Sequence, residues 1–141
     1  MKVVIAPDSF KGSLSASQVA EIMARAVQNE IPSAKVIKIP MADGGEGTID
    51  ALVTALNGNI KPIRVHGPLD GEIDTYFGCS GDKAILEAAN ICGITLLPTD
   101  ARNPMKTSTR GLGEAIRAAL DQGYRNFFIG IGGSSTNDGG M

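Results

Sequence analysis

Residues 127–141 read FFIGIGGSSTNDGGM, a strand-like apolar run that passes directly into glycines, hydroxyl side chains, an amide and a carboxylate. Glycines allow the backbone to take positive φ angles and to approach a ligand closely. Hydroxyl groups and free N–H groups at the end of a strand suit anionic oxygens. The stretch therefore indicates a binding loop after a buried strand, which is where ligands bind in α/β folds.

The same order of strand, polar loop and helix occurs twice within the first sixty residues. Residues 3–6 and 36–39 have the short apolar runs of buried strands. The first helix is predicted to begin at Ser15, which can form a capping box with Gln18. A second amphipathic helix follows the glycine loop 42–48. The apolar face of the first helix is predicted to consist of Val19, Ile22, Met23, Ala26 and Val27.

Short strands are predicted in the middle of the chain, at residues 60–65, 72–77 and 83–86, and the turn at 67–71 favours a hairpin between the first two. A third helix follows a polar segment, and its apolar face is predicted to hold Leu112, Ala115, Ile116, Ala119 and Leu120. A last strand precedes the terminal loop. The pattern predicts a layered α/β fold with a mainly parallel sheet. We place a unit boundary near residue 60, with one α/β unit at 1–60 and the start of a second at 61–141.

Composition excludes several classes of function. The 141 residues contain 13 Lys and Arg and 15 Asp and Glu, for a net charge of −2, without a basic stripe, and aromatic residues make up only 4%. Neither feature suits nucleic-acid binding. Cys79 and Cys92 lack the spacing of metal ligands and are expected to be buried thiols. No apolar stretch approaches the ~18 residues of a membrane span, so we expect a cytoplasmic protein with no membrane partner.

The first two polar loops combine charged residues with glycines. In residues 8–13, Lys11 lies among small hydroxyl residues and can bind phosphate as a point charge, although a solvated lysine beside serine N-caps explains the loop too. In residues 43–48, Asp43 and Glu46 lie among three glycines before a helix, where carboxylates can act as a base and as Mg²⁺ ligands. A tight turn with an acidic first helical turn is the alternative.

The other two loops are residues 106–111, whose hydroxyls and Arg110 suit either anion binding or ordinary N-capping, and the terminal loop. The chain has no Walker A motif, and residues 130–135 lack the third glycine of a dinucleotide-binding fingerprint. His66 is the only histidine and comes just before a Gly-Pro turn. A Ser-His-Asp hydrolase is therefore disfavoured.

Taken together, the four loops resemble the bacterial glycerate kinase family. The matching blocks occur in the family's order along the whole chain, and they are VIAPDSFKG at 4–12, ADGGEGT at 42–48, RNP at 102–104 with Thr107, Ser108 and GLGE at 111–114, and GIGGSSTNDGG at 130–140. The resemblance implies ATP-dependent phosphorylation of D-glycerate with Mg²⁺, giving 2-phosphoglycerate, with the 3-phosphate not excluded. It also implies two α/β units, one inserted in the other, with the active site between them.

On this interpretation Asp138 or Asp43 accepts the proton of the attacking hydroxyl or holds Mg²⁺, and the sequence does not separate the two roles. Lys11 neutralises a phosphate or the glycerate carboxylate, and Glu46 is a second candidate metal ligand. The remaining candidates are substrate- and phosphate-binding residues, namely Ser9, Arg110, Gly132, Gly133, Ser134, Ser135 and Asn137.

Members of the family are much longer than 141 residues. We therefore expect the chain to be an N-terminal portion that ends within its glycine-rich loop and to be inactive by itself. Two alternatives remain open: a non-catalytic α/β module that binds a small anion or nucleotide, and an enzyme that acts on a different hydroxy acid with the same loops.

Overall fold

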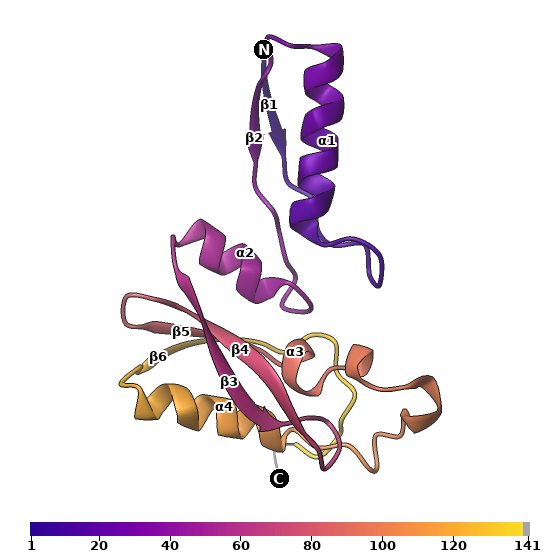
Figure 1. Ribbon diagram of the computed structural model, residues 1–141, viewed down its shortest axis with the longest axis vertical. Helices are drawn as coiled ribbons and strands as arrows, with labels where there is room; N and C mark the ends of the chain where they lie inside the picture. Colours follow the sequence, from indigo (N-terminus) through magenta and orange to yellow (C-terminus); the bar gives the residue numbers. More distant parts are fainter. Residues whose placement is uncertain (140–141) are drawn as a thin grey trace.

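The structure is a computed structural model that describes residues 1–139, and it consists of two bodies joined by one linker (Figure 1). The N-terminal body, residues 1–39, contains β1 (Lys2–Ile5), α1 (Ala16–Glu30) and β2 (Lys35–Lys38). The two strands pair in parallel, with Lys2 opposite Lys35. Parallel neighbouring strands require a crossover connection, and α1 forms this connection and packs on the two strands. The core of this body is formed by Ile5, Ala20 and Ala24, with Val3, Val27 and Val36 packed against them.

Helix α1 begins as predicted, with the capping box of Ser15 and Gln18 present. Its predicted apolar face is only partly right. Val19 is buried and Val27 packs on the core, but Ile22 and Met23 are about half exposed. The predicted Ala26 is exposed as well, and the buried residues of α1 are Ala16, Val19, Ala20 and Ala24, of which only Val19 was predicted. A two-stranded sheet covers only a narrow stripe of the helix, so the part of the chain that the structure describes leaves Ile22 and Met23 uncovered.

The main body, residues 48–139, is built on the sheet order β3-β4-β5-β6. Its strands are β3 (Asn59–His66), β4 (Glu72–Ser80), β5 (Lys83–Glu87) and β6 (Asn126–Gly130). The predicted hairpin is present, since β3 and β4 pair antiparallel from Asn59 opposite Cys79 to His66 opposite Glu72. Strand β5 pairs antiparallel with β4 and parallel with β6. The α/β class predicted from the sequence is confirmed, but this sheet is not mainly parallel, because β3, β4 and β5 pair antiparallel and only β5 and β6 pair in parallel.

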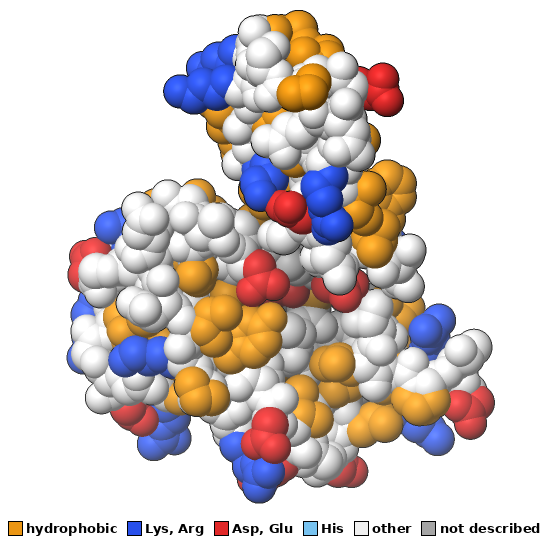
Figure 2. Space-filling view, turned by 45° about the horizontal axis from the view of Figure 1, so that its top comes forward, with side chains coloured by type: hydrophobic (Ala, Val, Ile, Leu, Met, Phe, Trp, Pro, Cys, Tyr) orange, Lys and Arg blue, Asp and Glu red, His pale blue; other side chains and the backbone are white. Residues whose placement is uncertain are grey.

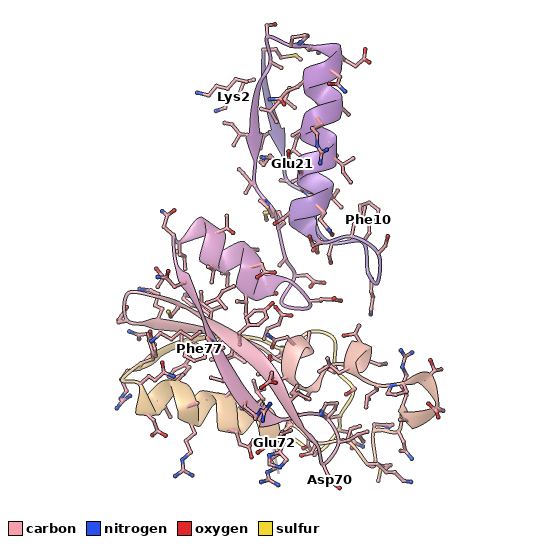
Figure 3. The ribbon with its side chains drawn as sticks, in the orientation of Figure 1. Lys2, Phe10, Glu21, Asp70, Glu72 and Phe77 are labelled. Atoms are coloured by element: carbon pink, nitrogen blue, oxygen red, sulfur yellow. The ribbon has the colours of Figure 1, made fainter. Side chains whose placement is uncertain are left out.

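Two helices cover opposite faces of this sheet (Figure 1). Helix α2 (Thr48–Ala55) packs on β4 and β5, and α4 (Arg110–Asp121) packs on β3 and β5. Side chains alternate along β4, so Phe77 lies in the core beneath α4, whereas Gly78 faces Ile49 and Val53 of α2. Figure 3 labels Phe77 within the main body, where it is fully buried and meets Tyr124 edge to face at 5.8 Å between ring centroids.

Helix α4 confirms most of its predicted face. Ala115 and Ala119 are fully buried, and Leu112 and Ile116 pack against the core, while Leu120 is partly exposed at the helix end. The sequence did not predict the short α3 (Ala89–Cys92) or the 3₁₀ helices at Ile94–Leu96 and Thr99–Ala101. Helix α2 falls before the predicted boundary near residue 60, yet it packs on the sheet of the main body. The boundary itself stays a prediction.

Two smaller expectations concern the thiols and hydrophobic spans. Cys79 and Cys92 are free and buried, as expected. Within residues 1–139, no helix is both long and apolar enough to cross a bilayer.

Candidate functional site

A pocket of about 620 Å³ opens where the two bodies meet. The N-terminal body contributes residues 9–18, whose exposed Phe10 Figure 3 labels in the loop nearest the main body. The linker contributes Pro40, Glu46 and Gly47, and the main body contributes residues from the first turn of α2, from β4 and from the end of β5 onward. The volume lies in the ~300–1,000 Å³ range of small-molecule sites. The junction is therefore the candidate site.

Carboxylates dominate the charge of this pocket. Lys11 is its one cationic lining residue within the described chain, whereas its acidic lining residues are Glu46, Asp50, Asp74 and Glu87. Figure 2 shows acidic side chains gathered at the junction of the two bodies and basic side chains on the adjoining edge of the N-terminal body. Burial raises the pKa of Tyr76, and the Asp50, Glu87 and Glu46 carboxylates raise it further, so its hydroxyl stays protonated as a possible donor in the pocket.

The glycine loop 43–48 is organised by local hydrogen bonds. Asp43 Oδ1 accepts the Gly45 N–H at 2.9 Å, and Thr48 Oγ1 donates to the Gly45 carbonyl oxygen at 2.7 Å. Gly47 is the N-cap of α2 and has a φ of +90°, a conformation that favours glycine. Having no side chain, it cannot cap the helix, and the cap comes from Glu87 on β5.

Sequence reasoning missed Glu87. This residue ends β5, is only 3% exposed and lines the pocket. A signal was available, because charged side chains are almost never fully buried without a partner, and the run Ala84-Ile85-Leu86 that precedes Glu87 is apolar. A carboxylate at the end of an apolar strand is therefore a candidate site residue.

The terminal loop contacts the first glycine loop through backbone atoms. The Gly132 N–H donates to the Gly44 carbonyl oxygen at 2.8 Å. A Cβ atom added at Gly130 would lie 2.6 Å from the Gly44 oxygen, and one added at Gly132 would lie 2.6 Å from Gly45 Cα. These glycines are therefore needed for the close approach of two loops, whatever they also do for a ligand.

The terminal loop also contacts the segment before α4. Asp138 accepts the Thr109 N–H at 2.6 Å and the Ser108 hydroxyl at 3.0 Å. Thr109, the N-cap of α4, makes no cap bond with its own side chain, and Asp138, from a distant part of the chain, accepts the backbone N–H of this N-cap residue. The buried Thr107 hydroxyl donates to the Ser135 carbonyl oxygen at 2.6 Å. Two of the four predicted loops are thus joined here.

The structure divides the candidate residues between two places. Ser9, Lys11 and Glu46 line the large pocket, whereas Ser134 and Ser135 line a smaller cavity of about 230 Å³ beside Arg102. The other candidates do not line either cavity within the described chain, and they are Asp43, Arg110, Gly132, Gly133, Asn137 and Asp138. Arg110 pairs with Glu114 on its own helix. In residues 1–139, no three His, Cys, Asp or Glu side chains form a cluster that could hold a metal.

Together, the fold and the pocket define an α/β protein with a small-molecule site between two bodies, although this class includes many unrelated activities. A model of the glycerate kinase family matches residues 3–141, and the chain belongs to that family. The family predicted from the loop motifs is confirmed.

Individual relatives agree with the family match. The chain is 52% identical to a glycerate kinase of Bacillus subtilis (strain 168) over 99% of its length, and 46% identical to a glycerate 2-kinase of Escherichia coli (strain K12), also over 99%. It spans about 37% of the length of both curated relatives. A crystal structure of a glycerate kinase 2 from Salmonella typhimurium LT2 matches 99% of this chain and 38% of its own, with a TM-score of 0.79 and 48% identity.

Proposed function

We propose that this sequence is part of a kinase that transfers the γ-phosphoryl group of ATP to a hydroxyl of D-glycerate, giving 2-phosphoglycerate and ADP. The observation that carries the proposal is the pocket between the two bodies, lined by the first two family loops through Lys11 and Glu46. The name of the Escherichia coli relative, glycerate 2-kinase, favours phosphorylation at the 2-hydroxyl.

The lining residues fit these ligands. Lys11 would neutralise a phosphate group or the glycerate carboxylate. A pocket wall with several carboxylates repels a bare polyphosphate, so the phosphates need an accompanying cation. Mg²⁺ commonly binds through one or two carboxylates together with substrate phosphates, so a three-carboxylate cluster is not required. Glu46 and Asp50 line the pocket and are the residues that would hold it, and the ion would offset the charge of the transferring phosphoryl group.

Two carboxylates are candidates for the proton acceptor. As the glycerate hydroxyl oxygen bonds to the γ-phosphorus and the bond from that phosphorus to ADP breaks, the hydroxyl proton would pass to Asp43 or Asp138. Each already accepts a backbone N–H, Asp43 from Gly45 and Asp138 from Thr109. Asp43 is therefore held by the loop that carries it, and Asp138 is held by the segment that precedes α4.

The test is a coupled assay of ADP release on the protein from the complete reading frame that contains this sequence. We expect turnover that requires both D-glycerate and Mg²⁺, with 2-phosphoglycerate identified by an enolase-coupled readout. Turnover with another hydroxy acid and none with glycerate would overturn the substrate. Nucleotide binding without turnover on any hydroxy acid would favour the non-catalytic module instead.

A further inference from the structure

Glu87 connects the sheet of the main body to the loop at the pocket. Its Oε1 accepts the Gly47 N–H at 3.2 Å and its Oε2 accepts the Ile49 N–H at 3.1 Å. These donors belong to the N-cap and the first turn of α2, which no side chain of its own caps. The bond to Gly47 spans 40 residues of sequence and the bond to Ile49 spans 38. The carboxylate therefore fixes where α2 begins relative to β5.

Stability alone does not explain a glutamate at this position. Within residues 1–139, no ion pair includes Glu87, so its charge is met by N–H groups and the α2 dipole. Burial raises the pKa of Glu87 despite the opposing bonds from the Ile49 and Gly47 N–H groups. A raised carboxyl pKa means that ionisation of this group lowers the stability of the folded state. This cost appears as the pH rises and the carboxyl group ionises.

The segment that Glu87 holds carries pocket residues. Glu46, Gly47 and Asp50 all line the pocket, and each lies within three residues of an N–H group that Glu87 binds. The Glu46 and Asp50 side chains are exposed. Their positions consequently depend on the backbone that bears them, and that backbone is attached to the sheet through Glu87.

We propose that Glu87 is a positioning residue, whose two-oxygen contact with the α2 N-terminus sets the position of Glu46 and Asp50 in the pocket. Its catalytic consequence rests on the proposed function, whereas the structural contact does not. Glutamine at this position keeps the shape, but only its carbonyl oxygen can accept, and its NH₂ group faces the second N–H donor. Glu87→Gln should therefore release one of the two contacts without opening a cavity.

The experiment compares wild type with Glu87→Gln in the protein from the complete reading frame, with Asp82→Asn as the matched control. Asp82 precedes the opposite end of β5 and contacts Lys83 and Asn126, away from the pocket. For Glu87→Gln we expect hydrogen exchange at the Gly47 and Ile49 amides to accelerate by about tenfold or more. We also expect kcat to fall by about tenfold to a hundredfold, while hydrogen exchange elsewhere in the main body stays at the wild-type rate. Asp82→Asn should leave kcat and both amides unchanged.

Two outcomes would overturn the proposal: wild-type exchange at both amides, or exchange accelerated equally throughout the main body, which is the signature of a general structural role. Faster local exchange together with kcat within twofold of wild type would overturn the link to catalysis. If wild type itself shows no glycerate turnover, the proposed function fails, and the exchange comparison still decides whether Glu87 positions the loop.

Discussion

The Glu114 carboxylate on α4 allows a quantitative test of how α4 is attached to β3. It accepts the His66 backbone N–H at 2.9 Å, lies 3.0 Å from His66 Nδ1, and accepts from Arg110 Nε at 2.9 Å. These contacts, led by the bond from the His66 backbone, lower the pKa of Glu114 from 4.5 to about 2. A displacement of that size corresponds to about 3 kcal/mol at full strength. Because the side chain is 33% exposed, solvent screening reduces the expected contribution to about 1–2 kcal/mol.

The sign of the pH dependence follows from the lowered pKa. The stabilisation is fully present above pH 4.5 and is lost as the pH falls through about 2. We expect Glu114→Gln to lower the free energy of unfolding by about 1–2 kcal/mol at pH 7, and the difference from wild type to close between pH 4.5 and pH 2.

Urea denaturation followed by tyrosine fluorescence measures this difference. The chain has two tyrosines and no tryptophan, and both Tyr76 and Tyr124 lie in the main body with α4. The control is Asp74→Asn, which breaks the ion pair between Asp74 and Arg64. Both of these side chains are largely exposed, so the free energy of unfolding should change little. Equal stability of Glu114→Gln and wild type at pH 7, or a gap that stays constant down to pH 2, would refute the reasoning.

Three further predictions test the packing and the proposed site. Gly111→Ala would place a Cβ atom 1.8 Å from a carbonyl oxygen of β3, and in chemical denaturation it should lower the free energy of unfolding by about 3 kcal/mol. Gly113→Ala is the control, because that position has open space around it, and it should raise the free energy of unfolding by about 0.5–1 kcal/mol. Ser15→Ala removes half of the α1 capping box and should cost about 1 kcal/mol in thermal denaturation of the N-terminal body. In the protein from the complete reading frame, Asp43→Asn or Asp138→Asn should lower kcat by about 10²–10⁴ if that residue is the base, or raise the Mg²⁺ requirement if it is a metal ligand; at least half of wild-type kcat in both variants would reject this assignment.

Most helices and strands could be predicted because short stretches of sequence mark where they begin and end. The capping box fixed the start of α1, and the Gly-Pro turn fixed the β3–β4 hairpin. Burial on α1 was harder to predict, because Ile22 and Met23 match the helical period but face no described element. Helix α3, with only four residues, is too short to show a period. Sequence period identifies an apolar stripe, while burial depends on what lies opposite it.

The candidate site was only partly accessible to the same reasoning. The loops with Lys11 and Glu46 do line the large pocket, as expected from polar loops at strand ends. Asp138, in contrast, binds the N-cap residue of α4 across about 30 residues of sequence, and Glu87 caps α2 across about 40. Both contacts depend on tertiary pairing of strands and helices, so the sequence could at most mark Glu87 as a carboxylate after an apolar run and could not identify the partner of either residue.

The backbone contact between the two glycine loops limits how this protein can accommodate substitutions. At most packed positions, a bulkier residue can be tolerated if its neighbour becomes smaller. Here the neighbour of Gly130 is the Gly44 carbonyl group and the neighbour of Gly132 is the Gly45 backbone, so nothing remains to be removed. We therefore expect a genetic selection for second-site suppressors of Gly130→Ala or Gly132→Ala to return only reversions to glycine and no compensating change at residues 44 or 45.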